Sequence, residues 1–334
     1  MKSARAAFSL AQWALACFLP FACGGTTLDA GSDSPHGLLP VDERNPVILS
    51  NDKPSDNWQG LYAVLFANSA GPALAGIIIN SSNYWPDIDA NSAGWRDLVT
   101  AARASGLQGI PDPIASVGPL LVRPSDGNLD ATIPNRSEGA RLIVETSARL
   151  SLPWRPLVVV TGGRLTDIAD AYLVDKTVAE RVVVVSSLGS ISPTGGTMGA
   201  PNGELDPWAD WIVAQRFRYV QVSAFYDQTS DILPAQLANL PQNPLGAFIA
   251  SQQPNIRNLA TAADQVGIIA VALSKFASAV QRVAQDPNAA FDATMGPPLV
   301  PDANGHIWLV TNSNGALATS HLWQLLLDPK TFGK

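Results

Sequence analysis

The sequence predicts an α/β domain with a mainly parallel β-sheet that is flanked by helices on both faces. Short apolar runs rich in Val and Ile recur along the chain, and segments with apolar residues at helical spacing separate them. Strands that are buried on both faces read as continuous apolar runs rather than as an alternating pattern. The chain has 334 residues, of which 46% are hydrophobic and 15% charged, so it can bury a sizeable core.

The first 23 residues (1–23) have the layout of a secretory signal peptide. Lys2 and Arg5 precede a largely apolar, uncharged run that ends at Ala22-Cys23-Gly24-Gly25. This ending is similar to a bacterial lipobox, in which Cys23 would be lipidated and become the mature N-terminus. The alternative is an ordinary cleaved signal with Cys23 as a bystander. We therefore expect an exported protein, either a membrane-anchored bacterial lipoprotein or a periplasmic or extracellular protein.

Residues 24–45 are polar and rich in Gly, Ser and Asp, which predicts a flexible tether before a domain at 46–334. Both cysteines, Cys17 and Cys23, lie in the leader, so the predicted domain has no disulfide and no thiol nucleophile. The formal net charge of −7 argues against a nucleic acid polymer as partner, since such binding needs clustered Lys and Arg. A membrane contact is expected through the lipid anchor only.

The elements alternate in order along the predicted domain. The apolar runs predict strands at Val47–Leu49, Leu74–Ile79, Leu157–Val160, Val182–Val185 and Tyr219–Val222. Helical spacing predicts helices at Gly60–Asn68, Ala93–Ala104, Leu165–Leu173 and Trp208–Arg216. The segment Gly118–Arg136 is rich in Pro, Asp and Asn, which predicts a long surface loop or a cover over the site.

Polar segments follow four of the predicted strands and together indicate one site. They are Ser50–Asn57, Asn80–Asn83, Thr161–Gly163 and Ser186–Asn202. Ligands of open parallel sheets bind beyond the carboxyl ends of the strands. Such a cluster of oxygen ligands and amides suits a hydroxyl-rich ligand, a hard cation such as calcium, or both.

The segment that begins at Ser50 is open to two interpretations. Ser50 and Asp52 share a face if the strand continues through both. Asp56 either contributes to the site or caps the helix that follows. Tyr84, Trp85 and Trp95 follow the second strand, and core packing is favoured over stacking on a ligand.

Four stretches carry a resemblance to a known family: "ILSNDKPSDN", "GIIINSSN", "VVVTGGRLTDIADA" and "NGELDPWADWIV". Together they resemble the inosine–uridine-preferring nucleoside hydrolase family, from about Pro46 to the C-terminus. The family motif D-x-D-x-x-x-D-D stands here as S-x-D-x-x-x-D-N. The resemblance implies a nucleoside hydrolase-like fold and a small-molecule partner, a nucleoside or a sugar.

The resemblance also implies roles for single residues. In that family a calcium ion binds the ribose hydroxyls and the attacking water. Carried over by position, Asp56 matches the ribose-binding Asp, and Asn83 and Asn202 match residues that contact the substrate. Thr161 matches a Thr whose carbonyl binds the metal, and Asp264 matches a late metal-binding Asp.

Two departures from the family motif bear on the chemistry. Ser50 replaces the Asp that accepts the proton of water, and Asn57 replaces a metal-binding Asp. Calcium affinity depends on ligand charge, so calcium binding is expected to be weakened. Asp52 is a conceivable substitute base. Two functions remain open: hydrolysis of an N-glycosidic bond, with Asp52 and Asp56 as catalytic residues, and binding of a sugar or nucleoside without catalysis.

Overall fold

The computed structural model describes residues 38–53, 59–68, 73–82, 85–187, 189–190, 201–222, 238–252 and 276–327. The described part of the expected tether packs onto the domain. Leu39 and Val41 are buried in the core, and Asn45 Nδ2 donates a hydrogen bond to the carbonyl of Pro156 at 2.7 Å. Residues of the expected tether from Leu39 onward therefore contribute to the same core as the strands.

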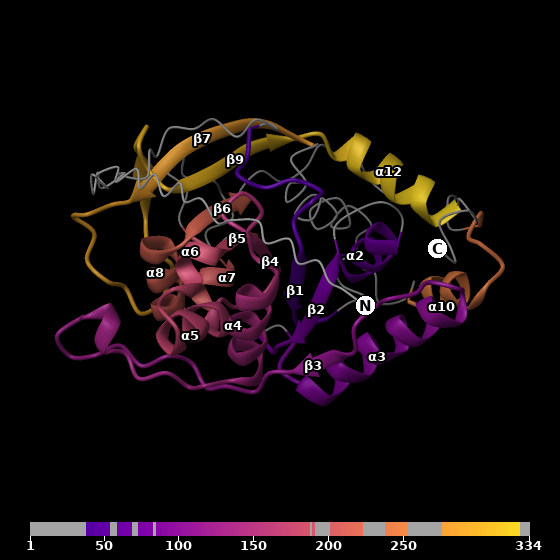
Figure 1. Ribbon diagram of the computed structural model, residues 1–334, viewed down its shortest axis with the longest axis horizontal. Helices are drawn as coiled ribbons and strands as arrows, with labels where there is room; N and C mark the ends of the chain where they lie inside the picture. The colour runs from indigo at the N-terminus through magenta and orange to yellow at the C-terminus, as the bar shows by residue number, and fades with distance from the viewer. Residues whose placement is uncertain are drawn as a thin grey trace, which may run out of the picture. The chain divides into compact units, whose positions relative to one another are not determined.

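The strands of the described residues form one sheet of nine strands, in the order β3-β2-β1-β4-β5-β6-β9-β7-β8 (Figure 1). Their bounds are β1 Val47–Asn51, β2 Leu74–Ile79, β3 Pro113–Ala115, β4 Leu157–Thr161, β5 Val182–Ser187, β6 Arg218–Val222, β7 Ala277–Gln285, β8 Leu299–Pro301 and β9 Ile307–Ser313. In this spatial order, each pair of neighbouring strands from β3 to β9 is parallel. β7 pairs antiparallel with both β8 and β9. The predicted mainly parallel sheet is confirmed.

The apolar runs form the central strands because both of their faces are buried. Every residue of β1 and β4 is buried, and Leu157 through Val160 are fully inaccessible to solvent. Side chains alternate between the two faces of a strand. Leu49, Val160 and Val185 therefore lie in one core, and Ile48, Val159 and Val184 in the other.

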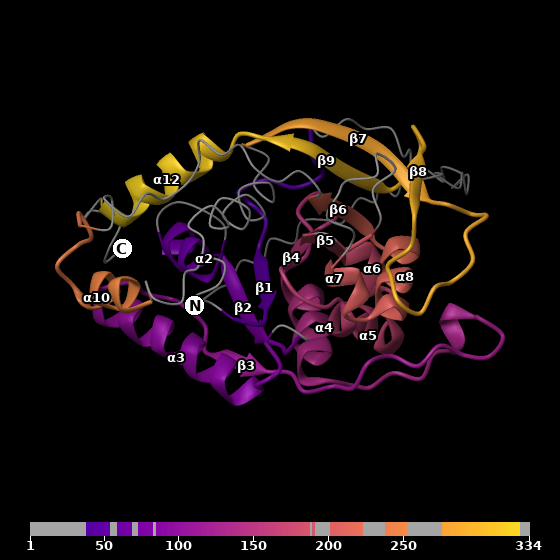
Figure 2. The same cartoon turned by 180° about the vertical axis from the view of Figure 1, so that it is seen from behind.

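Helices cover both faces of the sheet (Figures 1 and 2). The face of Leu49 packs against α2 Gln59–Asn68, α3 Ile88–Ala104, α10 Pro244–Ser251 and α12 Gly315–Leu327. The face of Ile48 packs against α4 Glu138–Leu150, α5 Thr166–Val174, α6 Val178–Arg181 and α8 Pro207–Arg216. A short helix, α7 Pro201–Glu204, precedes α8. None of the described helices is both long and apolar enough to cross a membrane.

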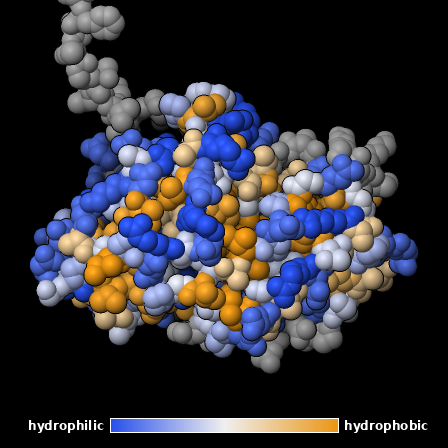
Figure 3. Space-filling view, turned by 60° about the horizontal axis from the view of Figure 1, so that its bottom comes forward, coloured by the Kyte–Doolittle hydropathy of each residue, from blue (hydrophilic) through white to orange (hydrophobic). Residues whose placement is uncertain are grey.

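The segment between Ser116 and Ser137 is irregular, apart from the 3-10 turn Leu129–Ala131. This agrees with the predicted surface loop. Val117, Val122 and Ile133 are exposed along it. Figure 3, turned to bring the bottom of Figure 1 forward, shows apolar groups spread among hydrophilic ones over this face.

Candidate ligand-binding site

Four polar side chains form one row across the middle of the sheet, at the same level in four neighbouring strands. Ser50 in β1 is paired with Thr161 in β4, Thr161 with Ser186 in β5, and Ser186 with Gln221 in β6. One residue earlier, the same four strands carry Leu49, Val160, Val185 and Val220. The four polar residues are almost completely buried. Because parallel strands end on one edge, the change from apolar to polar residues marks the base of a site there.

Asn80, which directly follows β2, completes this row at the side of β1. Its Nδ2 donates to Ser50 Oγ at 3.2 Å, and its backbone N–H donates to the carbonyl of Asn51. Its Oδ1 is buried and accepts no hydrogen bond from any residue that the structure describes. A Cβ at Gly163 would lie 2.8 Å from this oxygen, so the glycine after β4 leaves the space that Asn80 occupies. Asn80 Oδ1 is thus a buried acceptor at the end of this row.

Asp52 lies in a bend after β1, because the strand ends at Asn51. The condition under which Ser50 and Asp52 would share a strand face is therefore not met. Asp52 Oδ2 accepts from the Ser82 hydroxyl at 2.7 Å, and Oδ1 accepts from the Lys53 amide at 2.7 Å. Both carboxylate oxygens are hydrogen-bonded within the protein, which stabilises the end of β1.

The aromatic residues after β2 support this bend. Trp95 is fully buried, and its Nε1 donates to the carbonyl of Asp52 at 3.1 Å, so the prediction of core packing is confirmed for it. Lys53 Nζ lies 3.7 Å from the ring centroid of Trp85. These contacts hold the turn at Asp52 against α3.

The end of β5 is fixed by a buried polar cluster. The side-chain amide of Gln221 forms two hydrogen bonds with the backbone of Ser190, one of them from Ser190 N to Oε1 at 2.7 Å. Ser190 Oγ lies 3.1 Å from Asp210 Oδ1 on α8, and Tyr219 Oη donates to Gln221 Oε1. Burial raises the pKa of Asp210 to about 8, with the nearby Asp206 adding to the shift. Asp210 is therefore protonated at neutral pH.

The α7 helix, which carries Asn202, lies beside this cluster. A Cβ on Gly203 would lie 1.8 Å from the carbonyl oxygen of Gly189 and 2.6 Å from Asp210 Oδ2. Only a glycine permits this approach, so α7 is packed against the segment that follows β5. Asn202 is half-buried and directly precedes Gly203, which packs against Gly189 after β5.

Comparisons with known proteins support the architecture. No family model and no curated protein matches the chain. Solved structures do match. An inosine–uridine-preferring nucleoside hydrolase from Bacillus anthracis has a TM-score of 0.59 at 12% identity, over 84% of this chain and 99% of that one. A plant nucleoside hydrolase has a TM-score of 0.55 at 13% identity, over 85% of this chain and 99% of that one. This chain has a nucleoside hydrolase-like fold.

A third match is described as a nucleoside hydrolase-related hypothetical protein from Saccharophagus degradans that is associated with carbohydrate metabolism. Its TM-score is 0.55 at 16% identity, over 87% of this chain and 72% of that one. Identities of this size establish the nucleoside hydrolase-like fold alone. The site must therefore be judged from the residues of this chain.

Among the described residues, side chains that commonly bind metals do not gather at this edge. No group of three or more His, Cys, Asp or Glu residues is placed to bind a metal in the part of the chain that the structure describes. Asp52 is the acidic residue at the end of β1, and both of its oxygens already accept hydrogen bonds. Thr161 is fully buried at the end of β4, and its hydroxyl contacts the backbone of Gly163.

The structure brings together part of the predicted site. Ser50, Thr161 and Asn202 lie at the carboxyl ends of neighbouring strands or next to them, and Asp52 follows β1 directly. The other predicted site residues lie outside the described residues: Cys23, Asp56, Asn57, Asn83 and Asp264.

The sequence predicted Asn80 only as the first residue of a polar segment at the site, and it predicted no place there for Gln221. Asn80 is the first polar residue after the run Ile77–Ile79, and Gln221 is the one polar residue in the stretch Tyr219–Val222. A polar residue inside a buried strand is the signal that could have identified Gln221, as a polar residue directly after one did for the segment of Asn80.

Proposed function

We propose that this chain binds a ribosyl or nucleoside-type small molecule at the carboxyl edge of the sheet. The observation that carries this proposal is the buried acceptor Asn80 Oδ1, next to the row of Ser50, Thr161 and Ser186, in a nucleoside hydrolase-like fold. A buried polar atom without a partner costs about 1–3 kcal/mol. A ligand hydroxyl that donates to Asn80 Oδ1 would remove that cost.

Residues named by the resemblance complete the proposed site. Asp56 would accept hydrogen bonds from the sugar hydroxyls, and Asn83 and Asn202 would contact the ligand from two further loops. Two acceptors and two amides suit a vicinal diol, because each hydroxyl both donates and accepts.

The proposed metal site is a weakened calcium site made by Asn57, the Thr161 carbonyl and Asp264. It contains one carboxylate, and calcium affinity falls with the number of charged ligands. Support comes from the sequence, in which Ser50 and Asn57 replace two carboxylates of the family motif.

Hydrolysis of the N-glycosidic bond is the second candidate function. It is favoured by the buried Asp52 beside the proposed sugar site. In this reaction water adds to the anomeric carbon and the base leaves with a proton, so a group must take a proton from the water. A Ser hydroxyl is a poor base at neutral pH, and general-base catalysis is worth about 10²–10⁴-fold in rate. The non-catalytic binding function therefore agrees better with Ser50.

Calorimetric titration of the purified domain with inosine, uridine, adenosine and ribose tests the binding proposal. We expect at least one ligand to bind, and Asn80→Ala to weaken it about 10-fold. The matched control is Asn128→Ala, which removes a surface cap of the turn at Leu129. Equal affinity in the wild type and Asn80→Ala would contradict the role of Asn80, and no binding by any ligand would contradict the function.

Base release, followed with the same nucleosides, separates the two candidate functions. Turnover that a chelator abolishes would establish the hydrolase and the metal together. The double variant Ser50→Asp with Asn57→Asp restores the family carboxylates, and we expect it to bind calcium more tightly than the wild type. Asn80 Nδ2 already faces position 50 and can donate to the new carboxylate. Unchanged calcium affinity would show that these two positions do not form the metal site.

The proposal includes export with a lipid on Cys23. It is supported by Lys2 and Arg5, the apolar run after them, and the small residues around Cys23. A tether between the lipid and the domain would let the sheet edge meet small molecules outside the membrane.

A further inference from the structure

We propose that a second pocket, on the outer side of α8, binds a carboxylate carried on a six-membered ring. The cavity has a volume of about 480 Å³, a size typical of small-molecule sites. Its lining comes from three segments that are distant in sequence: Arg123–Leu129, Trp208–Gln215 and Ala289–Phe291. None of these residues belongs to the row at the strand ends, so this pocket is separate from the site proposed above.

Aromatic rings form the walls of this pocket. The ring of Phe291 packs edge to face against Trp208 at a centroid distance of 5.2 Å and against Trp211 at 5.6 Å. Trp208 and Trp211 are buried, and Trp208 Nε1 donates to Thr132 Oγ1, which fixes the orientation of its ring. The walls are thus held in place before a ligand arrives, and they offer apolar surface to the face of a ring.

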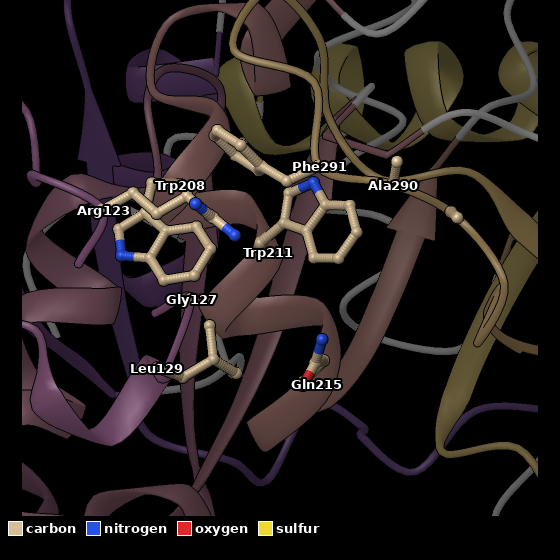
Figure 4. Close-up of a pocket in the computed structure, with 9 residues that line it drawn as sticks. Arg123, Gly127, Leu129, Trp208, Trp211, Gln215, Ala290 and Phe291 are labelled. Carbon is tan, nitrogen blue, oxygen red and sulfur yellow. The ribbon is translucent and has the colours of Figure 1, made fainter. Parts of the chain in front are cut away.

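A cation lies at the pocket and has no acidic partner among the described residues. The guanidinium of Arg123 lies 5.4 Å from the centroid of Trp208 and 5.1 Å from that of Phe291. Figure 4 shows it directed between the indole rings of Trp208 and Trp211. A Cβ at Gly127 would lie 2.5 Å from Arg123 Nη2, so the turn at Gly127 leaves room for this side chain.

The nearest acids in the sequence are bound elsewhere. Asp126 accepts from the backbone of Asn128, and Asp292 accepts from the backbone and hydroxyl of Thr294. The donors of the Arg123 guanidinium are therefore available to an anion from outside. Arginine is suited to a carboxylate, because its two parallel N–H groups match the two oxygens.

A second donor without a partner lines the same pocket. Trp211 is 8% exposed, and its Nε1 is buried without a hydrogen-bond acceptor in the described part of the chain. An indole N–H can only donate. The pocket thus presents a guanidinium and aromatic walls, with an unpaired N–H buried in the wall of Trp211, and the ligand that fits is negatively charged and ring-shaped.

Calorimetry on the full chain tests this proposal with two ring carboxylates, benzoate and glucuronate. They distinguish an aromatic from a sugar ring, and glucose and acetate serve as probes that lack the charge or the ring. We expect at least one ring carboxylate to bind 10-fold or more tightly than acetate and glucose. Arg123→Gln should weaken it at least 10-fold and Trp211→Phe about 3- to 10-fold, because the phenyl ring keeps the wall but lacks the donor.

The matched control is Arg141→Gln, an exposed arginine on α4 that pairs with Glu138. It should leave the affinity for the ring carboxylate unchanged. Binding that survives both Arg123→Gln and Trp211→Phe, or no preference over acetate and glucose, would overturn the proposal. Nucleoside titration of Arg123→Gln should match the wild type, so the failure of one proposed site can be told from the failure of the other.

Discussion

Ser50 illustrates how a single side chain carries information on both fold and chemistry. It ends an apolar run, it faces Thr161 across the strand pair, and its hydroxyl accepts from Asn80. The resemblance implies that a carboxylate at this position accepts the proton of water. The hydroxyl of Ser50 instead lies in the row of buried polar side chains. Under the proposed function, the hydroxyl at this position favours ligand binding over base catalysis, and the place of Ser50 in the fold is fixed by its neighbours.

Asp210 predicts a pH dependence of stability. Burial raises its pKa to about 8 in the folded protein, from the ordinary value near 4 that applies when the chain unfolds. Above pH 4 the unfolded state releases this proton while the folded state keeps it. The contribution of the protonated Asp210 carboxyl to the free energy of unfolding is therefore complete below pH 4. It is lost as the pH rises toward 8.

Asp210→Asn should remove this part of the pH dependence. We expect the loss of unfolding free energy between pH 5 and pH 8 to shrink by about 2 kcal/mol or more, since one pKa unit corresponds to about 1.4 kcal/mol. Urea denaturation at several pH values measures it. Asp292→Asn is the control, because that exposed carboxyl has a lowered pKa and stays ionised over this range. If the unfolding free energy of Asp210→Asn falls with pH as steeply as that of the wild type, the raised pKa of Asp210 would be refuted.

The site could be predicted from sequence at the level of strand ends but not of contacts. Ser50, Thr161 and Ser186 each follow an apolar run, which a reader of the sequence can see. The bond between Asn80 and Ser50 and the burial of Asp210 depend on which strands are neighbours, and β1 meets β4 only after more than 100 residues. Such pairs have no local signal.

The long segment Ser116–Ser137 is fastened to the domain by acids at the helix starts. Asp167 on α5 accepts from the hydroxyls of Ser116 and Ser137, and Asp170 accepts from the backbone of Ser137. Asp206, which caps α8, also accepts from the backbone of Leu121. Burial raises the pKa of both Asp167 and Asp206, so each of these contacts is formed away from water.

Ser137→Ala tests this attachment at the level of one element. The change removes the cap of α4 and two hydrogen bonds to buried carboxyls, from which we expect a loss of about 2–3 kcal/mol of unfolding free energy. Chemical denaturation measures the loss. Asn128→Ala removes an exposed cap with one bond and should cost about 1 kcal/mol or less. Equal losses in both variants would mean that the buried carboxyls do not depend on Ser137.

The elements that sequence reasoning found are those with continuous apolar runs. The five predicted strands occur within one or two residues of their expected bounds. Helix α4 was not predicted, although Ala140 and Ile143 are buried along it, because the small or polar residues Gly139, Thr146 and Ser147 share its buried face. Strand β7 was not predicted from the sequence either, because most of its side chains are only half-buried. Burial of small and polar residues in α4, and partial burial along β7, weaken the apolar signal of these two elements.

At the scale of the whole molecule, the sequence combines an acidic domain with a predicted leader that is basic at its start and then apolar. The formal net charge is −7, and Lys2 and Arg5 supply the positive start of the predicted leader. The proposed lipid anchor would therefore be the membrane contact of the protein.

Labelling of expressing bacteria with an alkyne analogue of palmitate tests that anchor. The wild type should carry the label and sediment with membranes, and Cys23→Ala should lose both properties, because the thiol is the acceptor of the lipid. Cys17→Ala keeps Cys23 and is the matched control. Label that persists in Cys23→Ala would exclude lipidation at this residue.

The row of four polar residues paired across neighbouring strands also affects how accurately the sheet folds. These residues are Ser50, Thr161, Ser186 and Gln221. If β1 slipped by one residue against β4, Ser50 would turn to the opposite core and Leu49 would face the polar row. Each such slip would bury a hydroxyl without its partners, so incorrectly paired sheets are selected against during folding. Residues that prepare the protein for a ligand thereby also act as a check on the alignment of its strands.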